Sequence, residues 1–324
     1  MSPRDRERAD ADSALGRVVA VHLGEVTVED AAGRPVPCRV RRVLKAEAAR
    51  TQLHAVAVGD FVRFRREADG TGLVLDVAPR RTFLARAEPR RPWIQHVIAV
   101  NIEQLVIVVS LRAPAPRLGL IDRYLAAANI GSLRPLLVIN KTDLGDAAEQ
   151  AALAAAYEGF DLPIVLASTA TGEGLAAVGA ALAGRESVLV GHSGVGKSSL
   201  LNALRPDLEL PTGEVSEATS KGRHTTSWIR MVEVAPGARV IDSAGIREFR
   251  PWGLKPEDLP IHFPEMIEFL ERCRFRDCSH THEERCGVRA AVESGLIRRS
   301  RYHSYLRLRE DLAAGARFGE GGGS

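Results

Sequence analysis

A glycine-rich stretch near the middle of the chain has the residues needed to bind phosphate. Gly191–Ser198 fits the spacing G-x-x-x-x-G-K-[ST], follows the apolar run Val188–Val190 and precedes leucines at helical spacing. Glycines let successive backbone N–H groups point at an anion, and a helix beginning at about Gly196 adds its partial positive charge. Lys197 can reach the β- and γ-phosphates, while the Ser198 hydroxyl can bind Mg²⁺. We expect this phosphate loop to comprise Gly191, His192, Ser193, Gly194, Val195, Gly196, Lys197, Ser198 and Ser199.

A second motif, N-K-T-D, follows the apolar run 136–139 and can read a guanine base. The Asp143 carboxylate can accept hydrogen bonds from N1–H and the 2-amino group of guanine, and adenine offers neither donor. Asn140 can tie the loop down, and the Lys141 stem can lie along the base. Ser168 begins a segment, after the next apolar run, whose backbone N–H can face the guanine oxygen. The residues expected at the base site are Asn140, Lys141, Thr142, Asp143 and Ser168.

Two segments downstream of the phosphate loop can complete a magnesium and γ-phosphate site. The segment G-R-H-T-T-S, residues 222–227, offers a hydroxyl from Thr225 or Thr226. D-S-A-G begins at Asp242, which can hold Mg²⁺ through water, and the N–H of Gly245 can bond the γ-phosphate. We therefore expect magnesium to be held by Ser198, Thr226 and Asp242.

The residue that would activate water is not where many GTPases place it. They have a glutamine directly after D-x-x-G, whereas this chain has Ile246, which cannot accept a hydrogen bond. Intrinsic hydrolysis should therefore be slow. His224 is the candidate replacement, because a neutral imidazole can accept a hydrogen bond from water; the alternative is that His224 contacts RNA or has no role. The expected catalytic residues are His224, Lys197 and Asp242.

Three cysteines and a histidine near the C-terminus have the spacing C-x4-C-x-H-x5-C. Three thiolates and one imidazole suit a closed tetrahedral site for structural Zn²⁺, whereas a catalytic zinc keeps an open position. Disulfides are a poor alternative, because the polar N-terminus is unlike a signal peptide and indicates a cytoplasmic chain. His282 is a competing ligand at this point. The expected ligands of one zinc ion are Cys273, Cys278, His280 and Cys286.

The 324 residues are enough for two or three domains. Short valine-rich strands in residues 14–81 predict a five-stranded barrel of OB type. Apolar runs alternating with helical stretches in residues 82–252 predict a parallel sheet covered by helices, a P-loop GTPase domain, with one antiparallel strand at 228–234. Residues 253–318 then form a helical zinc-binding domain. Residues 1–13 are expected to be a disordered tail and 319–324 a flexible one.

Charge is unevenly distributed although 44 Lys and Arg nearly balance 41 Asp and Glu. The barrel and the residues after 271 are basic, and the segment between them is acidic. Basic ends can grip RNA, although ordinary solvated arginines are an equal alternative. The arginines in question are Arg39, Arg41, Arg63 and Arg65 in the barrel, and Arg298, Arg299, Arg301, Arg307 and Arg309 interleaved with Tyr302 and Tyr305. No apolar run approaches the roughly 20 residues of a membrane span.

The motifs occur in a permuted order: N-K-T-D comes first, then G-H-S-G-V-G-K-S-S, then D-S-A-G. With the cysteine cluster, this order resembles the ribosome small-subunit-dependent GTPase A family, circularly permuted GTPases with an OB-fold barrel and a zinc domain. The similarity spans about Gly16 to Leu312. Ala244 stands where the family commonly has proline and Thr169 where it has alanine. The family pattern favours His280 over His282.

The resemblance implies a GTP hydrolase of late small-subunit maturation that binds ribosomal RNA, is stimulated by the subunit, and is a monomer away from it. Its ligands would be GTP and GDP with magnesium, and its partners would include no membrane. Two alternatives stand beside it. One is a GTP-gated RNA-binding checkpoint in which hydrolysis only permits release. The other is an ATP-using P-loop enzyme.

Overall fold

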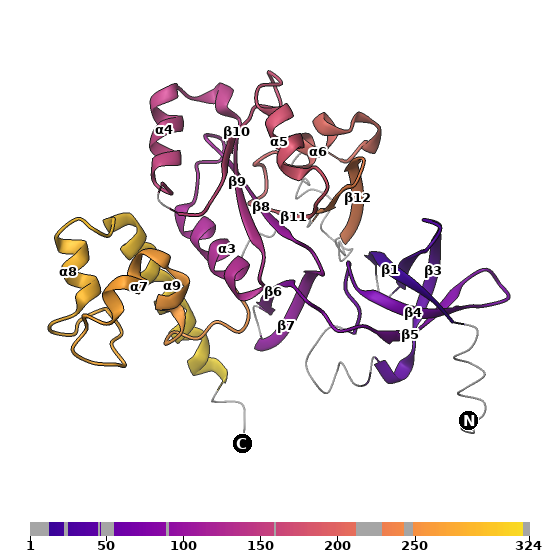
Figure 1. Cartoon of the computed structure of the whole chain (residues 1–324), viewed down its shortest axis with the longest axis horizontal. Coiled ribbons are helices and arrows are strands. Elements are labelled where there is room, and N and C mark those ends of the chain that lie inside the picture. The colour runs from indigo at the N-terminus through magenta and orange to yellow at the C-terminus, as the bar shows by residue number, and fades with distance from the viewer. Residues whose placement is uncertain are drawn as a thin grey trace, which may run out of the picture.

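The computed structural model describes residues 13–22, 25–44, 46, 55–88, 91–158, 160–211, 229–242 and 249–319. Figure 1 shows a barrel of N-terminal strands, a central sheet flanked by helices, and a group of C-terminal helices beside α3 (Leu118–Ile130). Within these ranges, no helix combines the length and the apolar character that crossing a membrane requires.

The N-terminal strands close into a barrel, which confirms the predicted OB-like fold. They are β1 (Ser13–His22), β2 (Glu25–Asp30), β3 (Pro35–Val40), β4 (Phe61–Arg66) and β5 (Gly72–Val77). Every second residue of β3 is buried, because alternate side chains of a strand point to opposite faces. Buried valines and Phe64 fill the interior. Pairing of β1 with both β2 and β4 closes the strand order β1-β2-β3-β5-β4.

Three of the arginines predicted to share a barrel face are ion-paired on its surface. The pairs are Arg39–Asp69 (3.6 Å), Arg63–Asp76 (3.8 Å) and Arg65–Glu67 (3.1 Å). Phe64 is fully buried, and the exposed ring of Phe61 lies under the guanidinium of Arg17, 4.8 Å away. These acidic neighbours compete with phosphate for the arginines. At these three positions, a solvated surface of ion-paired arginines is therefore a better interpretation than a nucleic-acid contact.

The central sheet has the parallel arrangement that the sequence predicts. Its strands are β8 (Gln104–Ser110), β9 (Arg134–Asn140), β10 (Ile164–Leu166), β11 (Glu186–Val190), β12 (Ile229–Ala235) and β13 (Ala238–Asp242). Their order is β10-β9-β8-β11-β13-β12, and each neighbouring pair is parallel except the antiparallel pair β12–β13. That exception also matches the prediction for residues 228–234.

Helices cover both faces of this sheet. They are α3, α4 (Ala147–Ala155), α5 (Leu175–Leu182) and α6 (Lys197–Leu204), with the short 3-10 turns η1 (Thr142–Leu144) and η2 (Pro206–Leu208). Leu105 and Ile107 of β8 pack with residues of α3 and α4, whereas Val106 and Val108 pack with residues of α5 and α6. The whole of β8 is therefore buried, which is why its sequence is a nearly unbroken apolar run.

The barrel continues the central sheet. Strand β1 pairs antiparallel with β12, and Ala20 lies opposite Arg230. Two ion pairs strengthen the junction: Arg17–Glu186, and Arg239–Glu29 at 2.6 Å. The edge strand β12 is thereby covered, so its backbone groups do not form an open sheet edge along this pairing.

A two-stranded antiparallel sheet, which comes after the barrel and before β8 along the chain, was not predicted. It consists of β6 (Phe83–Glu88) and β7 (Arg91–Val100). Upstream of it, the fully buried carboxylate of Asp60 accepts hydrogen bonds from Arg80 Nε and Nη2, at 2.9 and 2.8 Å, and from the Ala57 N–H at 2.7 Å. This charged cluster fixes the last part of the barrel to the segment that leads into β6.

The C-terminal region folds around its own core. Its elements are η4 (Leu259–His262), α7 (Pro264–Leu270), α8 (Gly287–Glu293) and α9 (Arg299–Gly319). Phe263, Met266 and Tyr305 are fully buried in that core, which also includes Ala126 of α3. The region therefore packs directly against the central domain (Figure 1).

The prediction that the arginines and tyrosines of α9 face RNA is wrong for two of them. Arg301 is 4% exposed and Tyr305 is fully buried, because both lie on the inward face of an amphipathic helix. Arg309 donates to the carbonyl of Pro256 at 2.7 Å. Arg299 and Arg307 lie on the exposed face.

Asp60→Ala should lower the free energy of unfolding by about 3 kcal/mol, because the partly buried Arg80 guanidinium and the buried Ala57 N–H lose their acceptor. Asp76→Ala is the matched control: Asp76 is exposed and 3.8 Å from Arg63, so its loss should cost less than ~1 kcal/mol. Urea unfolding of both variants measures the difference, and equal losses would contradict this role of Asp60.

Candidate nucleotide and metal sites

The predicted nucleotide residues meet at one edge of the central sheet. The parallel strands β8, β9, β10, β11 and β13 all end there, with Ser110 opposite Asn140 and Leu189 opposite Asp242. Ligands of open parallel sheets bind outside the carboxyl ends of the strands. The permuted motif order therefore does not separate the motifs in space.

The phosphate loop runs from β11 into α6, which begins at Lys197. Gly191, Gly194 and Gly196 all have positive φ, at 147°, 81° and 94°. A Cβ at Gly191 would lie 2.2 Å from the Val108 carbonyl oxygen, and one at Gly196 would lie 2.4 Å from Asn140 Nδ2. Glycine is required at both positions, for backbone conformation and for space. The remaining loop residues His192, Ser193, Val195, Ser198 and Ser199 lie in the loop or the first turn of α6.

Lys197 and Asp242 carry opposite charges at the sheet edge, and each affects the pKa of the other. Lys197 is 7% exposed, and its Nζ donates to the carbonyls of Gly191 at 2.9 Å and His192 at 3.1 Å. Burial lowers the pKa of Lys197, and the Asp242 carboxylate opposes this. Burial raises the pKa of Asp242, and the positive charges of Lys197 and Arg230 oppose that shift. Hydroxyl and carboxylate oxygens, here from Ser198 and Asp242, are ligands that Mg²⁺ prefers.

The N-K-T-D tetrapeptide contacts the phosphate loop. Asn140 is fully buried, and its Nδ2 donates to the Val195 carbonyl at 2.9 Å. Thr142 Oγ1 donates to the Ala167 carbonyl at 3.1 Å, which fixes the turn after β9 against the end of β10. Lys141 has a left-handed backbone conformation, with φ 59°, and its Nζ donates to the carbonyl of Ala113 at 2.5 Å.

Ser168 positions Asp143 through its side chain. Its Oγ donates to Asp143 Oδ1 at 2.5 Å and accepts from the N–H groups of Ala170 and Thr171, both at 3.2 Å. Its own N–H donates to the Glu173 carbonyl at 2.9 Å. Among residues 168–172, the N–H of Thr169 makes no hydrogen bond to another described residue, so it is the group available for the predicted contact with the guanine oxygen.

Four predicted residues lie outside the described residues: His224, Thr225, Thr226 and Gly245. Their roles stay predictions. One contact at this edge was missed: the Ala113 carbonyl that holds Lys141. The sequence did contain a signal for this contact. The A-P-A-P run at 113–116 comes soon after β8, a strand that ends at the same sheet edge.

The Cys/His cluster has the geometry of a metal site. One ligand atom from each of four residues lies within 4.8 Å of all the others, and these residues are Cys273, Cys278, His280 and Cys286. His280 Nδ1 is 3.5 Å from Cys273 Sγ and 3.4 Å from Cys286 Sγ. His282 is exposed, and its Nδ1 contacts Thr281 Oγ1 at 2.8 Å. The structure thus places His280, and not His282, with the thiols, a donor set that suits a tetrahedral divalent metal.

Side chains that were not expected to serve this cluster support it. The Tyr302 hydroxyl donates to the His280 carbonyl at 2.6 Å, and the Tyr305 hydroxyl donates to the Ser279 carbonyl at 2.8 Å. The Glu283 carboxylate accepts the N–H groups of Ser279 and Thr281, at 2.7 and 3.0 Å. Burial raises the pKa of Glu283, but these hydrogen bonds outweigh it and lower that pKa strongly. These hydrogen bonds hold the loop around the predicted ligand His280 in place, as contacts to metal ligands usually do.

Comparison with known proteins identifies the family. The RsgA GTPase family model matches residues 77–252, more than half of the chain. The chain belongs to the RsgA GTPase family. A relative from Gemmatimonas aurantiaca, named small ribosomal subunit biogenesis GTPase RsgA, is 40% identical over 259 residues, or 79% of this chain and 84% of that protein. A relative of the same name from Chromohalobacter salexigens is 41% identical over 303 residues, or 92% of this chain and 86% of that protein.

Two solved structures share the fold of this chain. YjeQ from Thermotoga maritima is 32% identical with a TM-score of 0.72, covering 93% of this chain and 99% of that chain. YloQ, described as a circularly permuted GTPase, is 25% identical with a TM-score of 0.66, covering 94% of this chain and 96% of that chain. As an RsgA GTPase family member, the chain is a GTP hydrolase with permuted motifs.

The Cys/His cluster should hold one divalent metal ion per chain. Cys278→Ser and His280→Ala should each abolish metal binding and lower the unfolding temperature of the C-terminal helices, because metal binding stabilises the folded loop. His282→Ala is the matched control and should keep the metal. Elemental analysis of the purified variants measures the metal content. Metal loss in the His282 variant, with retention in the His280 variant, would reverse the assignment.

Proposed function

We propose that this chain hydrolyses GTP during late maturation of the small ribosomal subunit, since its relatives are named for small ribosomal subunit biogenesis. One contact supports the GTP site above all others. The hydrogen bond from Asn140 to Val195 brings the guanine-type tetrapeptide against the phosphate loop, although the two residues are 55 positions apart. A nucleotide can therefore span both motifs.

In this site, Asp143 selects guanine and the phosphate loop binds the phosphates. The Ser168 hydroxyl holds one Asp143 oxygen, which orients the carboxylate toward the base. Lys197, now bonded to the loop carbonyls, would exchange them for phosphate oxygens, whose charge compensates its buried ammonium group. Ser198, Thr226 and Asp242 would hold Mg²⁺, which neutralises charge on the β- and γ-phosphates when bound. Gly245 would contact the γ-phosphate, and His224 would orient the attacking water.

The basic surface beside the Cys/His cluster is the stronger RNA contact. Four arginines there are exposed and have no ion-pair partner within the described residues, and they are Arg272, Arg274, Arg276 and Arg285. The exposed ring of Phe275, with the Arg274 guanidinium 5.3 Å from its centroid, can stack on an unpaired base. On the barrel, by contrast, acidic side chains already pair with Arg39, Arg63 and Arg65.

The cluster metal is zinc, because three thiolates and one imidazole are its usual ligands in closed sites. The protein acts in the cytoplasm, where small subunits mature, and is a monomer away from the subunit. Residues 14–81 form the barrel domain, 82–252 the GTPase domain and 253–318 the zinc domain.

Asp143→Ala should weaken GDP binding by about 10²–10⁴-fold, because two hydrogen bonds to a charged group are lost, each worth about 1.5–3 kcal/mol. ATP affinity should not change. Asp146→Ala is the matched control: Asp146 is an exposed acid that caps α4, so its loss should affect stability and leave base preference intact. Fluorescent-nucleotide titration measures the affinities. Tighter ATP than GTP binding, unchanged in the Asp143 variant, would favour an ATP-using enzyme.

Purified small ribosomal subunits should stimulate GTP turnover by the wild-type protein, and large subunits should not. His224→Ala should lower the stimulated kcat by about 10²-fold or more, with GDP affinity retained, because a positioned general base contributes about that factor. Absence of stimulation would remove the ribosomal role and leave nucleotide binding in place. Full stimulated turnover in the His224 variant would remove the catalytic role of that histidine.

The same assay separates an assembly enzyme from a checkpoint. Release of the protein from subunits is followed with GTP and with a non-hydrolysable analogue. Release that needs hydrolysis supports the enzyme proposed here. Release at the same rate with the analogue would favour a GTP-gated checkpoint.

A further inference from the structure

Helices α3 and α9 meet through two crossed ion pairs. Consecutive residues of α3 with opposite charge, Asp122 and Arg123, pair with Arg301 and Asp311 of α9. The Asp122–Arg301 pair is buried, with side chains 1% and 5% exposed, whereas the Arg123–Asp311 pair is at the rim, with side chains 28% and 50% exposed. The C-terminal region is thus fastened to the helix that borders the nucleotide site.

Arg123 has a second partner. Its Nη1 donates to the backbone carbonyl of Phe249 at 3.4 Å, while its Nη2 donates to the Asp311 carboxylate. Arg123 therefore joins α3, α9 and the segment that contains Phe249. Arg250, the next residue, also contacts α9 through the Leu312 carbonyl at 3.0 Å.

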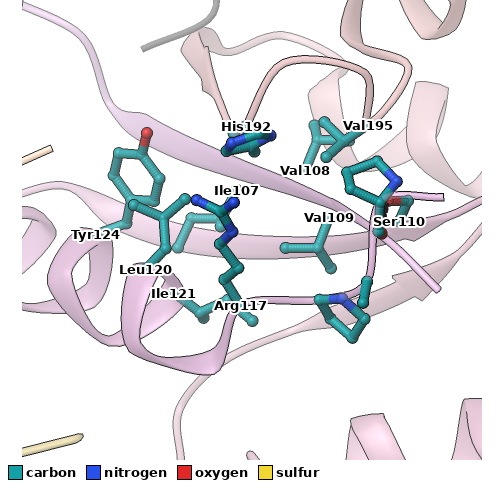
Figure 2. A pocket seen from close by; sticks show the side chains of 14 residues that line it. Ile107, Val108, Val109, Ser110, Arg117, Leu120, Ile121, Tyr124, His192 and Val195 are labelled. Atoms are coloured by element: carbon teal, nitrogen blue, oxygen red, sulfur yellow. Dashed lines mark hydrogen bonds between the residues drawn. The ribbon is translucent and has the colours of Figure 1, made fainter. Parts of the chain in front are cut away.

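Phe249 transmits this contact toward the phosphate loop. The Phe249 ring is 1% exposed and packs on the fully buried ring of Tyr124, with 4.5 Å between ring centroids. Tyr124 lines a pocket whose other wall includes Gly191 and His192 of the phosphate loop. Figure 2 shows Tyr124 and Leu120 on the side of this pocket that faces His192. Arg123 is thus connected to the wall of this pocket through the Phe249 carbonyl and the packed rings of Phe249 and Tyr124.

We propose that Arg123 is a positioning residue for the nucleotide site. By holding the Phe249 carbonyl it keeps the Phe249 ring packed on Tyr124, which lines the same pocket as Gly191 and His192 of the phosphate loop, and Asp311 keeps the Arg123 side chain in that position. The packing of α9 on α3 thereby affects how tightly the phosphate loop binds the nucleotide phosphates. The inference rests on GTP binding at the phosphate loop, as proposed above.

Release of a fluorescent GDP analogue, measured by stopped flow, tests the role of Arg123. Arg123→Met keeps the aliphatic stem and removes both contacts, so GDP release should be about tenfold faster, the expected effect of losing one charge-assisted hydrogen bond. Asp311→Asn removes only the exposed ion pair and should accelerate release by about threefold or less. Arg123→Lys, which keeps the charge, should recover part of the loss. The KM for GTP should rise in the same order.

Glu310→Gln is the matched control, because it removes an exposed acid next to Asp311 on the same helix. It should release GDP at the wild-type rate. Thermal unfolding distinguishes positioning from a structural role: a merely structural Arg123 would lower the unfolding temperature as Asp311→Asn does and leave GDP release unchanged. That result, or equal acceleration in the Glu310 variant, would overturn the inference. A wild-type protein that fails to bind GDP would instead overturn the proposed function as well.

Discussion

The hydrogen bond from the Asn140 side chain to the Val195 carbonyl holds together two segments that lie far apart in the chain. Asn140 is fully buried at the end of β9, and glycine at position 196 leaves the space that its amide occupies. A parallel sheet permits this contact, because the carboxyl ends of its strands meet at one edge whatever the order in which the chain visits them. Permuting the motifs changes the connections between strands and leaves that edge intact.

Permutation also determines what is attached to the site. Because β13 is the last strand of the central sheet in the chain, the next regular elements after Asp242 within the described residues are those of the C-terminal region, beginning with η4 at Leu259. On the other side, β12 lies between β13 and the barrel: Arg230 is paired with Asp242 across one ladder and with Ala20 across the other. The barrel is therefore attached beside the strand that ends at Asp242, and the C-terminal region follows that strand in the chain.

The local motifs could be predicted from sequence because their chemistry depends on spacing within a few residues. The phosphate loop, the N-K-T-D turn and the Cys/His cluster each lie on one short segment, and the strands around them are marked by apolar runs. The valine-rich strands of the barrel were equally visible, since their alternation follows directly from strand geometry.

Partners across long separations could not be predicted. Arg301 and Tyr305 lie in a helix whose composition is typical of RNA binding. Their roles are nevertheless decided by their partners, Asp122 on α3 and the Ser279 carbonyl beside the Cys/His cluster. Arg301 and Asp122 are 179 positions apart, and no local pattern indicates that pairing. The β6–β7 sheet was missed for a related reason: its strands pair with each other outside the large sheet, and no alternating apolar pattern marks them as clearly.

The environment of Arg301 shows what a buried charge provides that apolar packing does not. Its guanidinium contacts Asp122 and Glu265 and lies 4.8 Å from the ring centroids of both Phe160 and Phe263. Burial raises the pKa of Asp122, and the positive charge of Arg301 opposes that shift. Replacing such a cluster with apolar side chains is often neutral for stability, so stability alone does not account for it. Apolar contacts are non-directional, whereas a planar guanidinium requires its carboxylates at fixed positions. The cluster therefore sets the rotation and register of α9 on α3, and it is this register that places Asp311 next to Arg123.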